Sequence, residues 1–279
     1  MAAGDVKLIY GDKIQGSKKS VVLDGTDDYV ALAGIGAVNC TSGAITAWVN
    51  IVDLTATYCV FSVGDTDAES YLSLEIVAGK PRFRYMNATA LKMSLIATTA
   101  QITTAGWHHI AVVQDSIKPA LYLDGVLCTL TNTDTTDTTL WMAGVAGFDN
   151  ASIGILSMNS TTTLDFNGAI ADVKFFIGYL TDTQIMEEFK GIGITNSYTE
   201  GSGKGKQTGL LAWWDFNGDY LDDITGAGTY AGTATGGAYL DLQYSELTKQ
   251  LNAAWVAAGD VWDMTYANGQ LVVLHVEGV

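Results

Sequence analysis

The chain has few of the residues that lock or cross-link a backbone. Its 279 residues include two prolines and three cysteines. Cys40, Cys59 and Cys128 cannot all pair within one molecule, and their spacing suits no zinc site. These counts exclude a disulfide-dense scaffold and a structural zinc domain. We expect buried free thiols, with Cys40 and Cys59 as the one local pair that a disulfide could join.

Basic residues are also scarce. The chain has 14 Lys and Arg residues against 30 Asp and Glu residues, which gives a formal net charge of −16 at pH 7. Such a charge repels the phosphates of DNA and RNA, so nucleic-acid binding is not expected. The same charge is compatible with binding divalent cations.

Long apolar runs are missing too. No stretch of 18 apolar residues occurs, and residues 1–19 contain no apolar run of signal-peptide length. We therefore expect neither a membrane span nor export through a visible secretory signal. Hydrophobic residues still make up 48% of the chain, so a chain of this length can bury a full core.

What the sequence does contain is a rhythm of short β-type runs separated by turn residues. Such runs occupy residues 44–52, 58–64, 70–79, 81–87 and 107–115. Ala78-Gly79 predicts a turn, and Asp124-Gly125 predicts a two-residue hairpin turn, because both residues of such a turn need positive φ. The Thr-rich residues 131–140 are expected as an exposed loop or edge segment. This spacing is typical of a β-sandwich.

Two segments have a helical rather than a strand period. Thr181 followed by Gln184 forms a capping box before a short apolar face, and Gly191 ends the run. Ser245 similarly precedes a helical pattern that ends at Gly259. Residues 261–276, with Asn268-Gly269 between two apolar runs, predict a hairpin. Residues 245–279 are too small to fold alone, so we expect them to pack on the sandwich or on another subunit.

Six segments follow one another in the order of a known family. They are residues 23–30 (LDGTDDYV), 44–50 (AITAWVN), 107–113 (WHHIAVV), 121–125 (LYLDG), 166–185 (FNGAIADVKFFIGYLTDTQI) and 209–228 (GLLAWWDFNGDYLDDITGAG). Together they resemble laminin-G-like, concanavalin A-like lectin domains. Leu23 stands where the family pattern has Phe, and Lys174 where it has Arg.

The resemblance implies an all-β fold: an antiparallel concanavalin A-like jelly-roll sandwich with a short helix and a C-terminal helix-plus-hairpin appendage. The corresponding domains are an N-terminal arm at 1–19, the sandwich at 20–244 and a C-terminal assembly element at 245–279. Trp48 and Trp107 are expected to fill the space between the sheets, since one indole buries on the order of 150–250 Å².

Calcium is the candidate cofactor, because the family often holds Ca²⁺ at a sheet edge. This ion takes six to eight oxygen ligands. Asp172 matches the family's final-strand aspartate, and Asp215, Asn217 and Asp222 belong to the densest group of oxygen donors. Asp24, Asp27 and Asp28 form a second group. The alternative is that these aspartates only form turns, because their side chains bond nearby amides.

Carbohydrate is the candidate ligand. Sugars stack on exposed aromatic rings, and Trp141, Trp214 and Tyr220, with Asn150 as a polar partner, are the candidate platform. The alternative places these rings in the core or in a subunit contact. Trp213 and Trp214 are adjacent on a strand, so they must face opposite ways.

Catalysis is not expected. Related sandwiches that cut glucans place two glutamates and an aspartate on one strand, and no such motif occurs in this sequence. Glu69 and Glu75 are the nearest substitute, and they share a face only if their strand is unbroken. A retaining glycosidase needs two carboxyl groups about 5–5.5 Å apart. A β-glucan hydrolase is therefore the least favoured function.

Trp255, Trp262, Leu271 and Val273 would form an apolar patch, and such patches usually mark protein contacts. We therefore predict a non-enzymatic, homo-oligomeric structural protein of a virion surface, such as a phage decoration or fibre-associated subunit. It is made in the host cytoplasm and contacts other virion or surface proteins and glycans. The alternative is a carbohydrate-binding module or lectin of a bacterial surface system, placed outside the cell.

Overall fold

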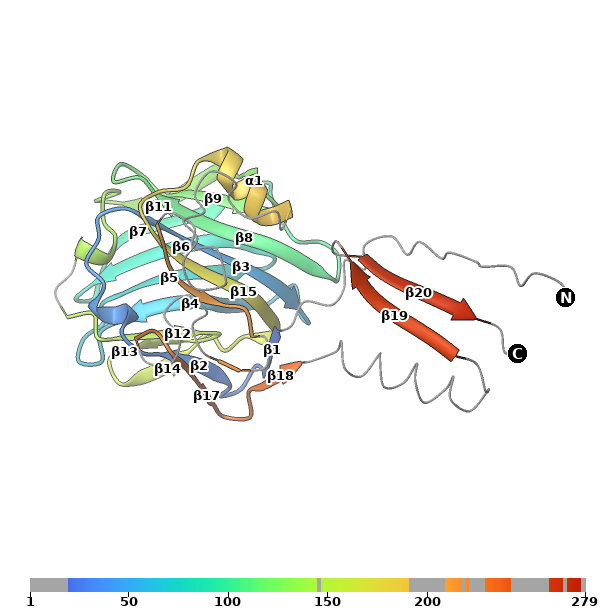
Figure 1. Cartoon of the computed structure of the whole chain (residues 1–279). Helices are drawn as coiled ribbons and strands as arrows, with labels where there is room; N and C mark the ends of the chain where they lie inside the picture. The colour runs from blue at the N-terminus through green and yellow to red at the C-terminus, as the bar shows by residue number, and fades with distance from the viewer. Residues whose placement is uncertain are drawn as a thin grey trace, which may run out of the picture. The chain divides into compact units, whose positions relative to one another are not determined.

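The computed structural model describes residues 20–144, 147–190, 209–216, 219–220, 229–241, 261–267 and 270–276. Of residues 132–135, 241, 261–267 and 270–276 it describes the backbone alone. Within these residues, two eight-stranded antiparallel sheets face each other, and one α-helix lies outside them (Figure 1). The predicted antiparallel sandwich is confirmed.

The first sheet, called sheet A, has the order β10-β9-β8-β3-β15-β1-β18, and β16 also pairs with β15. Its strands are β10 (Val126–Leu127), β9 (Ala120–Leu123), β8 (Trp107–Gln114), β3 (Gly43–Ile51), β15 (Asn167–Ile177), β1 (Ser20–Asp24), β18 (Tyr239–Asp241) and β16 (Leu210–Trp214). Strands far apart in sequence are neighbours, as in a jelly roll.

The second sheet, called sheet B, has the order β11-β7-β6-β5-β4-β12-β2-β17. Its strands are β11 (Leu130–Thr135), β7 (Ala90–Ala97), β6 (Lys80–Asn87), β5 (Tyr71–Val77), β4 (Thr57–Gly64), β12 (Asn150–Ile153), β2 (Tyr29–Leu32) and β17 (Gly232–Thr235). The Thr-rich segment contributes the edge strand β11, as its polarity predicts.

Smaller elements complete the sandwich. They are two short 3-10 helices, η1 (Ile35–Ala37) and η2 (Met142–Gly144), the hairpin β13 (Leu156–Met158) with β14 (Thr161–Thr163), and α1 (Asp182–Lys190). The capping box of α1 is present: the Thr181 amide donates to Gln184 Oε1 at 2.9 Å, and the Gln184 amide donates to Thr181 Oγ1 at 3.3 Å.

The two predicted tight turns join neighbouring strands. Ala78 and Gly79 connect β5 to β6 with φ values of 47° and 76°, and Asp124 and Gly125 connect β9 to β10 with 50° and 77°. Positive φ at both central residues matches the twist of the flanking strands. Each turn therefore fixes which side chains stand opposite one another across its hairpin.

The main core lies between the sheets, and strand alternation decides what enters it. On β5, Leu72, Leu74 and Ile76 point into this core, so Tyr71 and Glu75 point to the outer face of sheet B. All three cysteines are free, as expected, so Cys40 and Cys59 form no disulfide. Burial raises the pKa of the Cys40 and Cys128 thiols to about 11.

The chain divides into two compact units. One contains residues 19–241 and the other residues 1–18 with 242–279. The predicted hairpin is observed as β19 (Val261–Ala267) paired with β20 (Gln270–Val276). The predicted helix after Ser245 and the side chains of Trp255, Trp262, Leu271 and Val273 lie outside what the structure describes. In the described part of the chain, no helix combines the length and apolar character that crossing a membrane requires.

Candidate functional site

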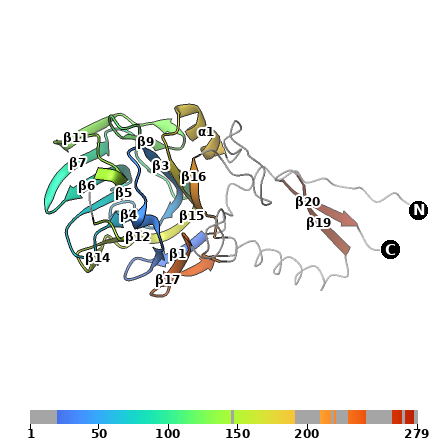
Figure 2. The same cartoon turned by 60° about the vertical axis from the view of Figure 1, so that its left-hand side comes forward.

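α1 covers part of the outer face of sheet A. An apolar patch formed by Ala44, Ala111, Val113, Tyr122, Phe176, Leu180, Ile185 and Leu210 lies beneath the helix and the segment before it. Phe189 of α1 stacks on Trp48 at 5.6 Å between ring centroids. Figure 2 shows the helix beside this sheet from a second side. Trp48 therefore packs under the helix, and its predicted place between the sheets is wrong.

A buried ion pair also joins the helix to sheet A. Lys174 Nζ lies 2.5 Å from Glu188 Oε2 and 3.5 Å from Asp172 Oδ1, and it lies 5.0 Å from the centre of the Trp213 ring. Burial opposes the charge of Lys174, but the two carboxylates outweigh it and raise the pKa of the ammonium group. Lys174 is therefore a fixed cation under the helix.

This pairing also involves Asp172, the first predicted calcium ligand. Its Oδ1 accepts a hydrogen bond from Trp213 Nε1 at 2.6 Å and faces the ammonium of Lys174. A second cation there would be repelled by Lys174, which disfavours a calcium ion at Asp172. Asp215 lies half-buried just after β16. Asn217 and Asp222 lie outside the described residues.

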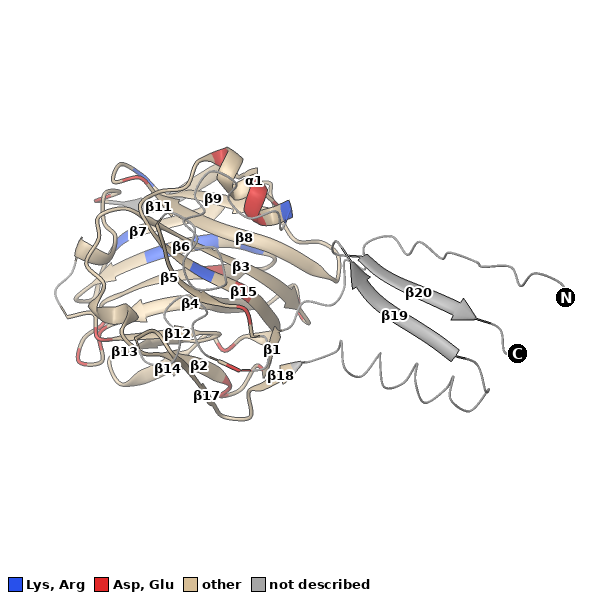
Figure 3. Cartoon of the chain, viewed as in Figure 1, with Lys and Arg blue, Asp and Glu red and all other residues tan. Residues whose placement is uncertain are grey.

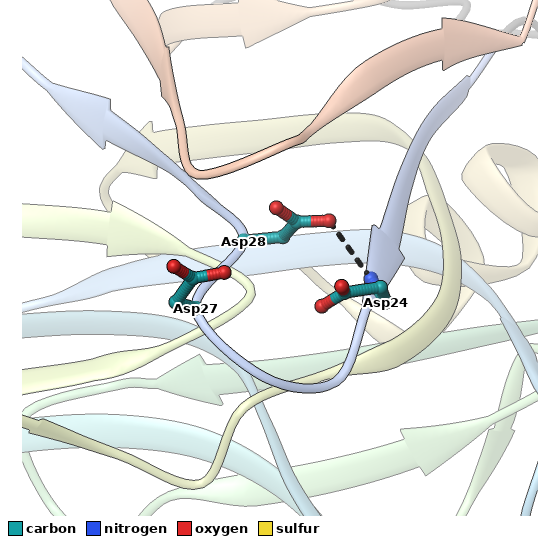
Figure 4. Close-up of side chains that lie close together, drawn as sticks. All are labelled: Asp24, Asp27 and Asp28. Atoms are coloured by element: carbon teal, nitrogen blue, oxygen red, sulfur yellow. Dashed lines mark hydrogen bonds between the residues drawn. The ribbon is translucent and has the colours of Figure 1, made fainter.

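A second group of carboxylates does converge, in the loop between β1 and β2 (Figure 4). One oxygen from each of Asp24, Asp27 and Asp28 lies within 4.8 Å of the others. Asp28 is buried, and its two oxygens accept hydrogen bonds from the amides of Asp24, at 3.0 Å, and of Gly237. Asp28 thereby ties this loop to the turn between β17 and β18.

A fourth carboxylate, that of Asp165, lies close enough for the charges of this group to shift its pKa. Burial, and then the negative charges of Asp27 and Asp24, raise the pKa of Asp165. Within the described part of the chain, no Lys or Arg forms an ion pair with these four aspartates. The donor set is hard oxygen, which suits Ca²⁺. The amide bonds of Asp28 equally fit the alternative reading, in which the aspartates shape turns.

Two of the predicted sugar platforms are in the core. Trp141 is 1% exposed and packs against Phe83 at 5.6 Å, and Trp214 is 0% exposed and packs against Phe61 at 6.3 Å. Neither ring can stack on a sugar, so these two predictions are wrong. Trp213, the neighbour of Trp214, faces the opposite way, as strand alternation requires.

The other two predicted sugar contacts are half-buried. The Tyr220 hydroxyl donates to the Ala238 carbonyl at 3.1 Å, and its ring meets Phe216 edge-on at 6.2 Å. Asn150 begins β12 opposite Gly64. With two members in the core, the four residues do not form the single binding surface that we expected.

The outer face of sheet B instead carries a cluster of charged side chains, called the Arg82–Arg84 site. Arg82 and Arg84 lie two residues apart on β6, opposite Glu75 and Ser73 of β5. Glu75 is 0% exposed, whereas the side chains of Arg82 and Arg84 are 20% and 21% exposed. Figure 3 colours the basic and acidic positions of the chain.

Both guanidinium groups are held by the one carboxylate. Arg82 Nε donates to Glu75 Oε2 at 2.6 Å, and Arg84 donates to Oε1 through Nε at 2.8 Å and Nη2 at 2.7 Å. Ser73 Oγ adds a bond to Oε1 at 2.6 Å. Burial opposes the charge of Arg84, but Glu75 outweighs it and raises the pKa of Arg84. The arrangement is rigid, because every member sits on a central strand.

An apolar ledge borders the Arg82–Arg84 site. Cys59, Tyr71 and Leu156 are buried together on this face, with Met86, Met158 and Leu164 packed against them. The guanidinium carbon of Arg84 lies 5.3 Å from the centre of the Tyr71 ring. Leu156 and Met158 belong to β13, so the β13–β14 hairpin supplies part of the ledge. Charged and apolar groups thus lie side by side.

The glutamates that we considered for glycoside hydrolysis are not arranged for it. Glu69 precedes β5, so it does not share an unbroken strand with Glu75. Both Glu75 oxygens accept hydrogen bonds from arginine. A catalytic pair needs one carboxyl group that gives up a proton to the leaving group. Among the described glutamates, these two provide no such pair.

A cavity of about 430 Å³ borders the same apolar patch, beside the start of α1. It is lined by Val113, Asp115, Lys118, Ala120, Tyr122, Tyr179, Leu180, Thr181, Asp182 and Thr183. The Tyr122 hydroxyl already donates to Asp182 at 2.7 Å, and Tyr179 is 59% exposed. This cavity combines an exposed ring with polar groups, but its hydroxyl and carboxylate satisfy each other.

Sequence reasoning missed the two arginines. A signal was present: they are the sole arginines in the chain, and they alternate as Arg-Phe-Arg one tight turn after Ser-Leu-Glu. Alternation with that turn places Ser73, Glu75, Arg82 and Arg84 on one face. The segment has the pattern of an ordinary strand, and the pairing of the arginines with Glu75 depends on the register across the turn.

Comparisons with known proteins agree with this fold. No curated protein matches the chain, and 240 chains of solved structures do. The CBM40 of an IT-sialidase from Ruminococcus gnavus, bound to α2,3-sialyllactose, has a TM-score of 0.51 and 16% identity, over 62% of this chain and 97% of that one.

Two further structures extend over more of the chain. The heptameric SAP-like pentraxin of Limulus polyphemus has a TM-score of 0.51 and 12% identity, over 80% of this chain and 94% of that one. A protein of Bacteroides ovatus described as carbohydrate-binding has a TM-score of 0.52 and 16% identity, over 81% and 60%. At these identities the likeness shows the fold alone.

A family model is matched by the sequence itself. The model of the concanavalin A-like lectin/glucanases superfamily matches residues 24–186, more than half of the chain. That span runs from the acidic loop to α1. The chain belongs to the concanavalin A-like lectin/glucanases superfamily.

Proposed function

We propose that the protein is a non-catalytic carbohydrate-binding module and that it binds sugar on the outer face of sheet B. The observation that carries this proposal is the Arg82–Arg84 site: fixed hydrogen-bond donors on rigid neighbouring strands, beside an apolar ledge. Binding sites combine apolar contact with a few polar groups that fix orientation. Sugar rings present both kinds of surface, hydroxyl groups at the edge and C–H groups on the face.

The other surfaces support sugar binding less well. Part of the outer face of sheet A lies under α1, and the cavity near Tyr179 has the Tyr122 hydroxyl and the Asp182 carboxylate bonded to each other. The acidic loop offers carboxylate oxygens, which accept hydrogen bonds but donate none. The arrangement of Glu69 and Glu75 supports binding without hydrolysis.

A glycan array tests the proposal, read with the full chain in calcium and in EDTA. We expect binding to a restricted set of glycans and no release of reducing sugar. Ile96 lies opposite Arg82 on β7, so Ile96→Trp should obstruct the face. Thr183→Trp, on α1, is the matched control and should bind like the unsubstituted protein. Equal binding by both variants would place the sugar elsewhere.

Where the module works is a second proposal. The two ends of the chain form a compact unit of their own, which supports a role in attachment to a neighbouring subunit. A virion surface is the setting that we favour, and a bacterial surface lectin is the alternative. We expect deletion of residues 242–279 to leave the sandwich folded and to reduce the mass in solution from an oligomer to a monomer. Static light scattering measures this mass, and an unchanged number of subunits would contradict the assembly role.

A further inference from the structure

The charge of the Arg82–Arg84 site is opposite to that of the molecule. Two guanidinium groups surround one carboxylate, so the site carries one excess positive charge, while the chain as a whole carries −16. Both arginines of the chain are used here. One arginine would be enough to neutralise Glu75, so the second is not explained by pairing alone.

The position of Glu75 is equally unusual. Its side chain is averted from the core, yet it is 0% exposed, because the two arginines lie over it. Burying a carboxylate is costly, and a buried ion cluster is weak evidence for stability. Such clusters do hold side chains in fixed positions. Glu75 and Ser73 therefore act as supports that set the two guanidinium planes.

The fixed planes leave donors available. Each guanidinium group has five N–H donors, and Glu75 takes those at Nε and Nη2. In the part of the chain that the structure describes, no protein acceptor is assigned to Nη1 of Arg82 or of Arg84. The forked geometry of arginine matches the two oxygens of a carboxylate. A second carboxylate could bind at the outer side of the pair.

We propose that the Arg82–Arg84 site binds the carboxylate of an acidic sugar, with the sugar ring resting on the ledge of Met86 and Met158. This inference deepens the proposed function and rests on it. A neutral glycan would leave the excess charge unmatched. A sulfate or phosphate group would also meet the charge and can bind the arginine fork through two oxygens, so the comparison with a sulfated sugar below tests the choice of a carboxylate.

Calorimetry with the full chain and paired sugars tests the inference. The probes are 3′-sialyllactose against lactose, galacturonic acid oligomers as a second carboxylate source, and 3′-sulfolactose as the non-planar anion. We expect both carboxylate sugars to bind at least about tenfold more tightly than lactose, which is roughly the effect of one charged hydrogen bond. Affinity for them should fall as salt is raised. 3′-Sulfolactose should bind more weakly than 3′-sialyllactose.

Substitutions then locate the effect. Arg84→Gln and Arg82→Gln should each weaken binding of the carboxylate sugars about tenfold or more. Arg84→Lys, which keeps the charge but loses the fork, should fall between them and the unsubstituted protein. Lys190→Gln removes the same charge from the exposed end of α1 and should change nothing. If the arginine variants fail to fold, the ratio of 3′-sialyllactose to lactose in the unsubstituted protein decides.

The outcomes separate this inference from the proposed function. Equal binding of lactose and the carboxylate sugars, or full binding by Arg84→Gln, would overturn the carboxylate site and leave a neutral-sugar module. Tighter binding of 3′-sulfolactose would overturn the choice of a carboxylate. Failure of every glycan on the array would overturn the proposed function together with the inference.

Discussion

The two outer faces of the sandwich each hold buried charge, and they differ in how that charge is paired and covered. Each carries a cluster of charged side chains on central strands, and these side chains point away from the main core. On sheet A, Lys174 is matched by Glu188 and Asp172, and α1 covers the group. On sheet B, Glu75 is matched by two arginines that remain about one fifth exposed. On sheet A two carboxylates face one ammonium, and the enclosed pair of Lys174 and Glu188 fastens the helix. On sheet B the excess positive charge is partly exposed and is therefore available to a ligand.

The difference also follows from the side chains used. Lysine is a compact charge on a flexible stem, so it can be enclosed by a helix that brings one glutamate. Arginine presents several donors in a plane, so one carboxylate cannot occupy them all. The face with lysine is thus complete, and the face with arginine keeps donors for another partner. The predictions below test that contrast, beginning with the largest effect.

Glu188→Ala should be the most damaging substitution on the covered face. It leaves Lys174 buried with only the more distant Asp172, and removal of one partner of a buried pair typically costs about 3–5 kcal/mol. Urea unfolding measures the loss in the free energy of unfolding. Thr183→Ala on the exposed side of the same helix is the control, and it should change this free energy by less than about 0.5 kcal/mol.

The double variant Lys174→Met with Glu188→Leu sharpens the test. Replacing a whole buried pair by apolar residues of similar volume is often neutral or stabilising. We therefore expect the double variant to recover most of the stability that Glu188→Ala loses. If the double variant is as unstable as the single one, packing of the helix rather than the charge balance holds this face together.

On the open face, Glu75→Gln should cost less. Its removal leaves two guanidinium groups without their carboxylate, but both reach water, so screening reduces the penalty to about 1–2 kcal/mol. Unfolding of this variant should thus lie between Glu188→Ala and the unsubstituted protein. A loss as large as that of Glu188→Ala would mean that the two faces do not differ in the way we describe.

The fold could be predicted from sequence patterns because the turns, caps and strand alternation that define it are local and repeated. The Ala78-Gly79 and Asp124-Gly125 turns, the Thr181–Gln184 capping box and the polar edge strand after Leu130 all follow from the backbone preferences of a few neighbouring residues. Alternation also showed correctly that Trp213 and Trp214 face opposite ways. Each of these features is decided within about ten residues of chain.

The choice between faces is not local, and there the sequence misled us. Trp48 was expected between the sheets and Trp214 at the surface, and the structure places them the other way. Alternation gives two sets of side chains but does not say which set faces the second sheet. That depends on α1, which is about 140 residues beyond Trp48 and covers one face. The calcium prediction for Asp172 did not foresee its ion pair for a similar reason, because Lys174 is held beside Asp172 by Glu188 of that helix.

The acidic loop differs from both charged clusters, because no Lys or Arg in the described part of the chain pairs with its aspartates. We expect about 1 mM Ca²⁺ to raise the midpoint of thermal unfolding by a few degrees, because a ligand that binds the folded state stabilises it. Asp27→Asn should remove the shift, and EDTA should reverse it. Lys118→Gln, away from this loop, is the control and should respond like the unsubstituted protein. No shift in the unsubstituted protein would favour the turn-forming role of these aspartates.

The smallest effect concerns Asp165, at the same loop. Burial and the charges of Asp27 and Asp24 raise its pKa in the folded state above the ordinary value of 3.8. Its favourable contribution is therefore present below pH 3.8 and is lost as the pH rises through the raised pKa. Without calcium, Asp165→Asn should be more stable than the unsubstituted protein at pH 7, by less than about 1 kcal/mol after solvent screening.

That difference should vanish near pH 3 and change sign when calcium is added, because the ion then compensates the carboxylates. Thermal unfolding across this pH range, in EDTA and in calcium, measures both effects. A variant that is less stable at pH 7 in EDTA would show that Asp165 is held by favourable contacts, and that the loop does not carry unbalanced negative charge. The loop would then resemble the covered face of sheet A, where every charge already has its partner within the fold.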